Sequence, residues 1–188
     1  GDSKVVDAQG KPLVVYHGTA RDFSTFRPSR RGNFGAGIYL ASTPDQAENF
    51  AYGDDGGDNI MPVYVAMERP FYTKADYAAG EEVDIDSPAV PLVRDVFGSG
   101  ASRALSRLRN SDTGHLSTAV RDRLLEMGHD GIIATYSDGS SEYVAFRPEQ
   151  IKSATGNRGT FDPAETDIRL SRAGDAIDTA KSALTARN

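Results

Sequence analysis

Three side chains with chemical capacity occur beside apolar runs of the sequence. His17 ends one such run, Tyr39 lies inside a second, and Glu142 opens a third. An imidazole can donate or accept a hydrogen bond, an aromatic ring can stack, and a fixed carboxylate can stabilise positive charge. Each residue also has an ordinary structural interpretation, so only their order and spacing can indicate a site.

Several other chemistries are excluded by residue type. The chain has no cysteine, which excludes disulfides, thiolate zinc sites and a cysteine nucleophile. None of its three histidines stands at metal-ligand spacing from another, so we expect no metal. Gly35-Ala36-Gly37 lacks the later glycine or lysine of a phosphate-binding loop, and no Gly-x-Ser-x-Gly elbow occurs.

Charge and hydropathy favour a globular domain that does not bind nucleic acid broadly. The 188 residues are 38% hydrophobic and 26% charged, with a formal net charge of −6. No stretch approaches the roughly 20 apolar residues of a membrane span, so we expect no membrane partner. Arginines nevertheless cluster in residues 21–31 and again in residues 94–123. Residues 94–123 could contact RNA or DNA phosphates, or could form a solvated helix face.

Hydrophobic periodicity and turn residues predict a mixture of strands and helices without regular alternation. We therefore expect an α+β fold. Thr43 can cap a helix whose first position is Pro44, with Gln46 reaching back to the cap and the helix ending near Tyr52. Residues 20–36 are polar and glycine-rich, which predicts a mobile loop. The expected strands are 5–7, 13–16, 37–41, 61–67, 131–136, 142–146 and 151–155, and further helices are expected at 102–109, 116–127 and 175–184.

The three motifs together resemble the ADP-ribosyltransferase superfamily. Their order is similar to that of the His-Tyr-Glu class, which includes diphtheria toxin and the poly(ADP-ribose) polymerases. The first motif is His17-Gly18-Thr19 after a strand, the second is Gly37-Ile38-Tyr39-Leu40-Ala41 before a helix, and the third is Ser141-Glu142-Tyr143-Val144. The beginning of the chain and the segment from Phe146 to Ser171 resemble such domains in large polyvalent proteins of phages and mobile elements.

The resemblance implies a split β-sandwich of two small facing sheets with flanking helices and a cleft for NAD as co-substrate. Glu142 would stabilise the positive charge that develops on the ribose, so the implied catalytic residues are Glu142, His17 and Tyr39. The NAD-binding residues implied by the resemblance are His17, Gly18, Thr19, Tyr39, Phe50, Arg27 and Arg31.

Two departures from the family pattern bear on the site. Poly(ADP-ribose) polymerases carry a serine and a second tyrosine on the helix after Gly-Ile-Tyr, and this chain has Ala47 and Phe50 there. Phe50 can still stack, and Ser42 or Thr43 could replace the serine. Arginine-specific relatives keep an acid or glutamine two residues before the glutamate, where this chain has Ser140, which disfavours arginine as the acceptor.

The sequence therefore predicts a mono-ADP-ribosyltransferase that acts on a protein or nucleic acid. Three alternatives stay open: an NAD glycohydrolase using the same site, an inactive NAD-binding or interaction module, and a nuclease using His17 and Glu142. We expect a catalytic domain over residues 1–163 and a linker or tail over 164–188, cut from a longer protein. We also expect a cytoplasmic location in a bacterial host.

Overall fold

A computed structural model describes residues 2–19, 23–51, 59–75, 88–108, 115–155 and 166–168. The side chains of Phe50 and of four residues in the 101–108 helix are not among those described. The expected helix at 175–184 lies outside the described residues.

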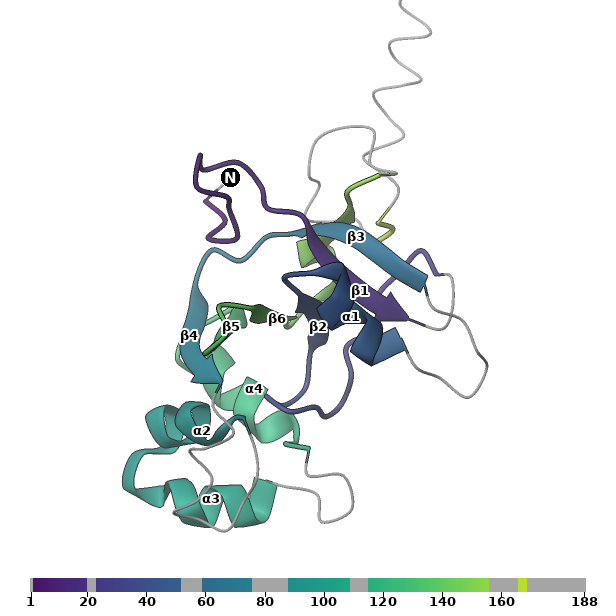
Figure 1. The fold of residues 1–188 in the computed structure, drawn as a ribbon. Coiled ribbons are helices and arrows are strands. Elements are labelled where there is room, and N and C mark those ends of the chain that lie inside the picture. Colours follow the sequence, from purple (N-terminus) through teal and green to yellow (C-terminus); the bar gives the residue numbers. More distant parts are fainter. Residues whose placement is uncertain are drawn as a thin grey trace, which may run out of the picture.

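A seven-stranded mixed sheet forms the centre of the molecule, with the strands in the order β4-β5-β6-β2-β1-β3-β7. Helices pack around it, which confirms the α+β class (Figure 1). The strands are β1 Val15–Thr19, β2 Ile38–Ala41, β3 Asn59–Val65, β4 Pro70–Ala75, β5 Gly131–Tyr136, β6 Ser141–Ala145 and β7 Ile151–Ser153. The helices are α1 Pro44–Ala51, α2 Val90–Phe97, α3 Ala101–Leu108 and α4 Thr118–Glu126, with 3-10 turns at Gly98–Gly100 and Pro148–Gln150.

The sheet is weakest between β1 and β2, at its middle. These strands pair at one register position, Tyr16 with Ala41, whereas β1 pairs with β3 at five. Beyond Tyr16 the two central strands therefore separate, and loop residues enter between them. The two small sheets expected from the sequence are thus halves of one sheet, joined at a single pair and split above it.

Helix α1 begins as the sequence predicts and packs closely on β1. The Thr43 hydroxyl accepts a hydrogen bond from the Gln46 N–H at 3.2 Å, as an N-cap does. The Gln46 side chain reaches back to Ser42, one residue before the expected partner. Ala47 and Ala51 are fully buried, and a Cβ at Gly18 would lie 1.9 Å from the Ala47 carbonyl oxygen. Only glycine at position 18 allows this approach.

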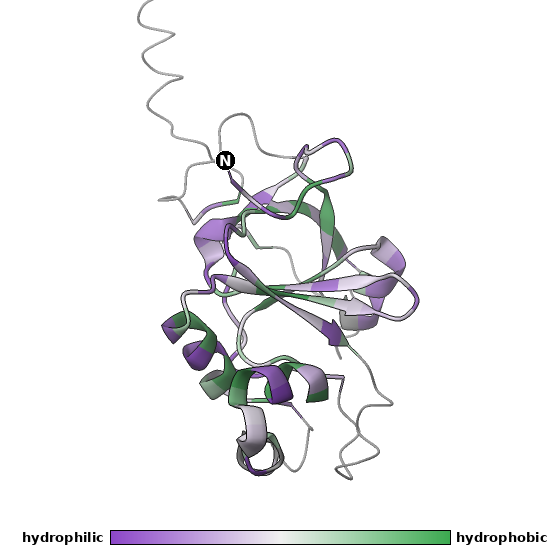
Figure 2. Cartoon of the chain, turned by 90° about the vertical axis from the view of Figure 1, so that its left-hand side faces the viewer, coloured by the Kyte–Doolittle hydropathy of each residue, from purple (hydrophilic) through white to green (hydrophobic). Residues whose placement is uncertain are grey.

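The helical end of the molecule is the part that the sequence predicted least. Strand β4 pairs in parallel with β5, and the crossover between them holds α2, α3 and α4. Figure 1 shows α2 and α3 together at this end, beyond β4. Figure 2 shows hydrophobic and hydrophilic residues alternating along these helices. Their apolar residues, Val90, Leu92 and Val93 among them, join one buried cluster with Phe34 and Val144.

A second buried cluster lies around the N-terminal half of the sheet and includes part of the expected tail. Val15, Phe26 and Leu40 belong to it, and so does Ile168, which is 2% exposed. Ile168, which lies in the expected tail, therefore packs into this cluster. The described helices are at most nine residues long, and none of them is long and apolar enough to cross a membrane.

Candidate active site

A cleft of about 830 Å³ opens where β1 and β2 separate, within the size range of ligand pockets. It is lined by the end of β1, the start of β2 and the connecting segment between them. The lining residues are His17, Gly18, Phe23, Ser24, Thr25, Phe26, Arg27, Ser29, Gly37, Ile38 and Tyr39. The cleft thus brings together four of the sequence-predicted residues: His17, Gly18, Arg27 and Tyr39.

The side chain of His17 makes a hydrogen bond across the split between β1 and β2. Its Nδ1 lies 2.8 Å from the Tyr39 carbonyl oxygen. Because a carbonyl oxygen only accepts, Nδ1 carries the hydrogen and Nε2 of the neutral ring is an acceptor. Burial lowers the pKa of His17 from its ordinary value, although the bond to Tyr39 opposes this. The rings of Phe23 and Phe26 meet the imidazole edge-to-face, at 5.7 and 4.9 Å between centroids.

Hydrogen bonds to its hydroxyl hold Tyr39 in place, so its ring forms a fixed wall of the cleft. The hydroxyl donates to the Gly35 carbonyl at 2.6 Å and accepts from the Phe34 N–H at 3.0 Å. A Cβ at Gly32 would lie 2.3 Å from the Tyr39 hydroxyl oxygen, so the loop needs glycine there. Burial, opposed by the Phe34 N–H and reinforced by the charge of Glu142, raises the pKa of Tyr39. The ring is therefore neutral and immobilised at neutral pH.

The loop before Tyr39 is more ordered than its composition predicts. Ser29 pairs with Gly37, and Gly32 pairs with Leu116, by two backbone hydrogen bonds each. Phe34 is fully buried. The expected mobile loop is therefore fastened to the core over its second half, because one buried phenylalanine and these pairs outweigh the polar residues around them.

Glu142 is buried in the sheet beside Tyr39. It lies on β6, opposite Ala41 of β2 and Ala134 of β5, and it is 3% exposed. Small side chains thus stand opposite Glu142 on both neighbouring strands, and Glu142 itself is not among the residues that line the cleft. Its Oε2 has no hydrogen-bond partner in the part of the chain that the structure describes. Burial raises the pKa of Glu142 to about 7, and a hydrogen bond with Tyr136 opposes the rise.

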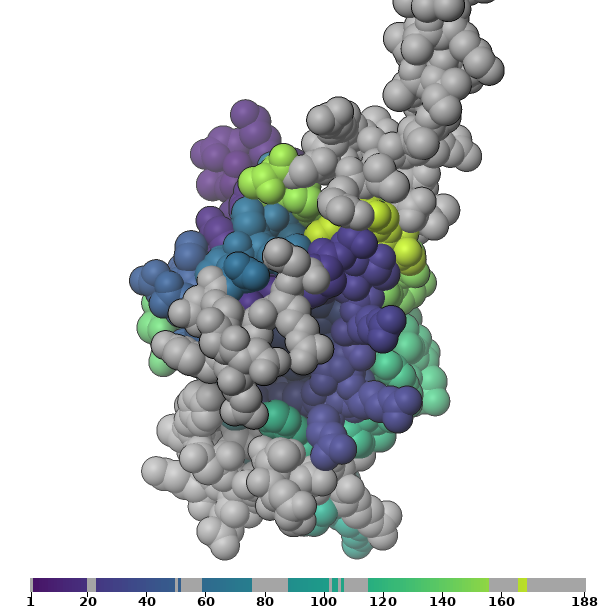
Figure 3. All heavy atoms as spheres, turned by 90° about the vertical axis from the view of Figure 1, so that its right-hand side faces the viewer, coloured from purple at the N-terminus to yellow at the C-terminus, as the bar shows by residue number. Residues whose placement is uncertain are grey.

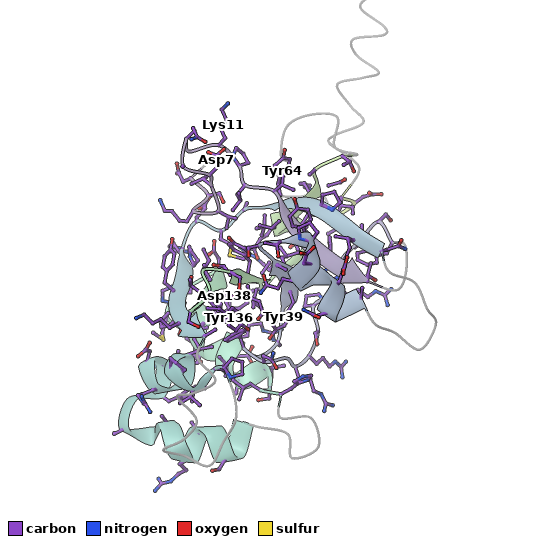
Figure 4. All side chains as sticks on the ribbon, in the orientation of Figure 1. Asp7, Lys11, Tyr39, Tyr64, Tyr136 and Asp138 are labelled. Atoms are coloured by element: carbon purple, nitrogen blue, oxygen red, sulfur yellow. The ribbon has the colours of Figure 1, made fainter. Side chains whose placement is uncertain are left out.

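Tyr136, which contacts Glu142, was not predicted from the sequence, and Ser42 was considered only for a ligand contact. Tyr136 is a diagonal neighbour of Glu142 in the β5–β6 hairpin, and its side chain hydrogen-bonds the carboxylate. Figure 4 shows Tyr39 and Tyr136 in the same central part of the molecule. Ser42 accepts from the Ser141 N–H at 2.9 Å and donates to Gln46. The expected hairpin could have identified Tyr136. Ala134 lies opposite Glu142, and Tyr136 is two residues further along the same strand, so its side chain is on the same face of the sheet.

The remaining predicted residues are less closely tied to the cleft. Arg31 is exposed and is not among the lining residues, although its carbonyl accepts a hydrogen bond from the Ser29 hydroxyl. Thr19 ends β1 opposite Asn59, also outside the lining. The Phe50 side chain lies outside the described residues. Ser140 bonds the Asp138 carboxylate through its N–H and hydroxyl, so its polar groups serve the hairpin turn.

The described residues also form a second hollow, which is separate from this cleft. The hollow, about 490 Å³, is lined by Ala66, Glu68, Arg69, Asp130, Arg147, Glu149 and Gln150 and contains none of the predicted site residues. Its buried Gln150 amide bonds four backbone groups and is fully engaged. Among the described residues, no group of three histidine, aspartate or glutamate side chains could hold a metal ion.

Comparison with known proteins identifies the family. The sequence profile of the ADP-ribosyltransferase in polyvalent proteins matches residues 7–161, which include His17, Tyr39 and Glu142. No curated protein matches. One similar solved chain, from a crystal structure of an anti-CRISPR protein, is 18% identical with a TM-score of 0.35, over 78% of this chain and 95% of that one. A likeness at that level informs neither fold nor function. On the family profile, which covers most of its length, this chain belongs to the ADP-ribosyltransferases of polyvalent proteins.

Proposed function

We propose that the protein cleaves the nicotinamide–ribose bond of NAD and transfers one ADP-ribose to a protein or nucleic acid. The observation that carries this proposal is the Glu142 carboxylate, buried between two alanines with one oxygen that has no hydrogen-bond partner among the described residues. A buried charge without full pairing costs stability, and such cost is typical of a functional site.

Each predicted residue has a task that its surroundings support. The neutral His17 presents Nε2 as an acceptor for a ribose hydroxyl. The immobilised ring of Tyr39 provides a stacking surface for nicotinamide, worth about 0.5–1.5 kcal/mol beyond buried area. Arg27, which lines the cleft, carries a positive charge toward the pyrophosphate. In this proposal Thr19, Phe50 and Arg31 complete the binding surface.

Glu142 performs the chemical step in its ionised form. When the C–N glycosidic bond breaks, its electron pair leaves with nicotinamide and positive charge develops at the ribose. The Glu142 carboxylate stabilises that charge through the adjacent ribose hydroxyl, a preorganised electrostatic effect. The acceptor nucleophile then attacks the same carbon, and Glu142 takes its proton. Removing a group of this kind costs about 10²–10³ in rate.

Nicotinamide release tests this proposal and separates it from the alternatives. Wild type is compared with Glu142→Ala, and with Asp95→Ala as a control at an exposed carboxylate of α2. We expect release by wild type and by the control, and a loss of at least about 100-fold in Glu142→Ala. Stimulation by cell lysate, with labelled ADP-ribose recovered on a macromolecule, supports transfer. Nicotinamide release that lysate does not change indicates a glycohydrolase. If the protein neither binds NAD nor releases nicotinamide, it is an inactive module.

The acceptor and the cellular setting are parts of the same proposal. Since Ser140 stands two residues before Glu142 with its polar groups committed to Asp138, the site lacks the second acid used on arginine. We therefore propose an acceptor other than arginine, reached in the cytoplasm of a bacterial host by a larger protein. Treatment of the labelled product with protease and with nuclease distinguishes a protein acceptor from a nucleic acid.

A further inference from the structure

One wall of the cleft is a short segment with no regular secondary structure. Residues Phe23 to Arg27 all line the cleft. Phe23 and Phe26 meet each other edge-to-face at 4.8 Å, and both meet the imidazole of His17. Together with the bond from Nδ1 to the Tyr39 carbonyl, these two rings therefore set the orientation of His17 and the direction of Nε2.

The backbone of this wall is held by the C-terminal residues Asp167 and Ile168. The Ile168 N–H donates to the Ser24 carbonyl at 2.8 Å, and Thr25 forms an antiparallel bridge with Asp167. On its other side, the Ile168 carbonyl accepts from the Ser153 N–H of β7 at 3.0 Å. Backbone hydrogen bonds thus connect β7 through Ile168 to the cleft wall. Figure 3 shows the yellow surface of this segment against the violet surface of the N-terminal region.

The side chain of Ile168 anchors the connection in the core. Ile168 and Phe26 are each 2% exposed and belong to the same buried cluster, together with Ile151 of β7. Phe23 packs against this cluster from outside. Removing the Ile168 side chain would leave a cavity beneath the wall, and a cavity of that size lets neighbouring side chains shift.

We infer that Ile168 is a positioning residue for the NAD cleft: it fixes the Phe23–Arg27 wall, and through it the ring of His17, from a point outside the residues that match the family profile. That profile ends at residue 161, before Ile168. The inference rests on the proposed function for the identity of the ligand. The coupling of Ile168 to the wall stands on the contacts alone.

Two measurements on the full chain test the inference. The first is hydrogen exchange of the amides of residues 23–27, which needs no ligand, and the second is the affinity for NAD with the KM and kcat of nicotinamide release. Ile168→Ala is compared with Leu92→Ala, a fully buried residue of α2 in the other cluster. Ile168→Val keeps the β-branched shape and tests rescue.

We expect Ile168→Ala to accelerate exchange in residues 23–27 and to raise the Kd and KM for NAD at least about tenfold, with kcat within about threefold. Ile168→Val should restore most of the wild-type affinity. Leu92→Ala should lower the Tm comparably and leave both the exchange of the wall and the Kd within about twofold. If Ile168→Ala does not fold, a smaller acceleration in Ile168→Val confined to residues 23–27 gives the same support.

The inference is overturned if residues 23–27 of Ile168→Ala exchange hydrogen at the wild-type rate. It is also overturned if their exchange is faster but the Kd for NAD is unchanged. An equal loss of affinity in Leu92→Ala would reduce Ile168 to a general stabilising residue and also overturn it. Failure of the proposed function looks different, because wild type itself would then neither bind nor cleave NAD. In that case the exchange data still decide whether Ile168 fixes the wall.

Discussion

The cleft and the helical end of this molecule are held together in different ways. Around the cleft, a Cβ at Gly18, Gly32 or Gly37 would lie 1.9, 2.3 or 2.4 Å from its nearest neighbour. At the helical end, a Cβ at Gly98 or Gly100 would meet nothing within 4 Å. Close packing against glycines thus fixes the cleft, against the backbone of α1 at Gly18 and against side chains at Gly32 and Gly37, whereas buried side chains such as Leu92 hold the helices. A small change should therefore be costly in the first region and mild in the second.

The largest effect is expected for Gly18→Ala compared with Gly100→Ala. The added methyl group at position 18 must displace the backbone of α1, which should lower the free energy of unfolding by about 3 kcal/mol or more. At Gly100 the methyl group has open space, so the change should stay within about 1 kcal/mol. Denaturant titration of both variants measures this. Equal stabilities would show that backbone approach does not distinguish the regions.

The next effect concerns the buried carboxyl of Glu142 in the sheet and depends on pH. Burial raises the pKa of Glu142 from 4.5 to about 7. The folded protein therefore binds more protons than the unfolded chain between these values, and stability falls as pH rises from about 4.5 to 7. The full cost is about 3 kcal/mol above pH 7.

Glu142→Gln should remove this pH dependence. Its stability relative to wild type should improve by up to about 3 kcal/mol between pH 4 and pH 8. Asp95→Asn, an exposed carboxylate at the helical end, should follow wild type. Thermal unfolding at the two pH values provides the comparison. Parallel curves for wild type and Glu142→Gln would mean that Glu142 is not held in a destabilising environment.

A smaller effect is expected for Tyr39→Phe. The variant keeps the ring but loses the bonds of the hydroxyl to Gly35 and Phe34, which should cost about 1–2 kcal/mol of stability. Since these bonds immobilise the stacking wall, NAD affinity should fall by about tenfold. Calorimetric binding with the conservative control Phe97→Leu at the helical end checks this. Unchanged affinity would indicate that the ring needs no anchor.

Sequence reasoning succeeded where local pattern and structure coincide. The cap of α1 at Thr43, the β5–β6 hairpin and the strand positions of Tyr39 and Glu142 follow from neighbouring residues, whereas His17 lies within β1 and not after a strand as expected. The chemistry assigned to the three motif residues came from family resemblance, and it stays a prediction for this chain.

The features that sequence reasoning missed depend on distant partners. Strand β4 pairs with β5 some 60 residues later, and its alternation of exposed and buried residues gave no strong apolar run. Ile168 is a single apolar residue in a polar stretch, so no periodicity marks it as buried. Gly18 was assigned to ligand contact, whereas its nearest constraint is the backbone of α1. Such contacts become visible only when the chain is folded.

The most direct test of the central claim is nicotinamide release from NAD as a function of pH, measured for wild type and Glu142→Gln. Because the carboxylate is the active form, the wild-type rate should rise with pH through an apparent pKa near 7. Glu142→Gln should bind NAD and release nicotinamide at least about 100-fold more slowly at pH 8. A Glu142→Gln variant as fast as wild type would contradict the account, because the buried carboxylate would then take no part in the reaction.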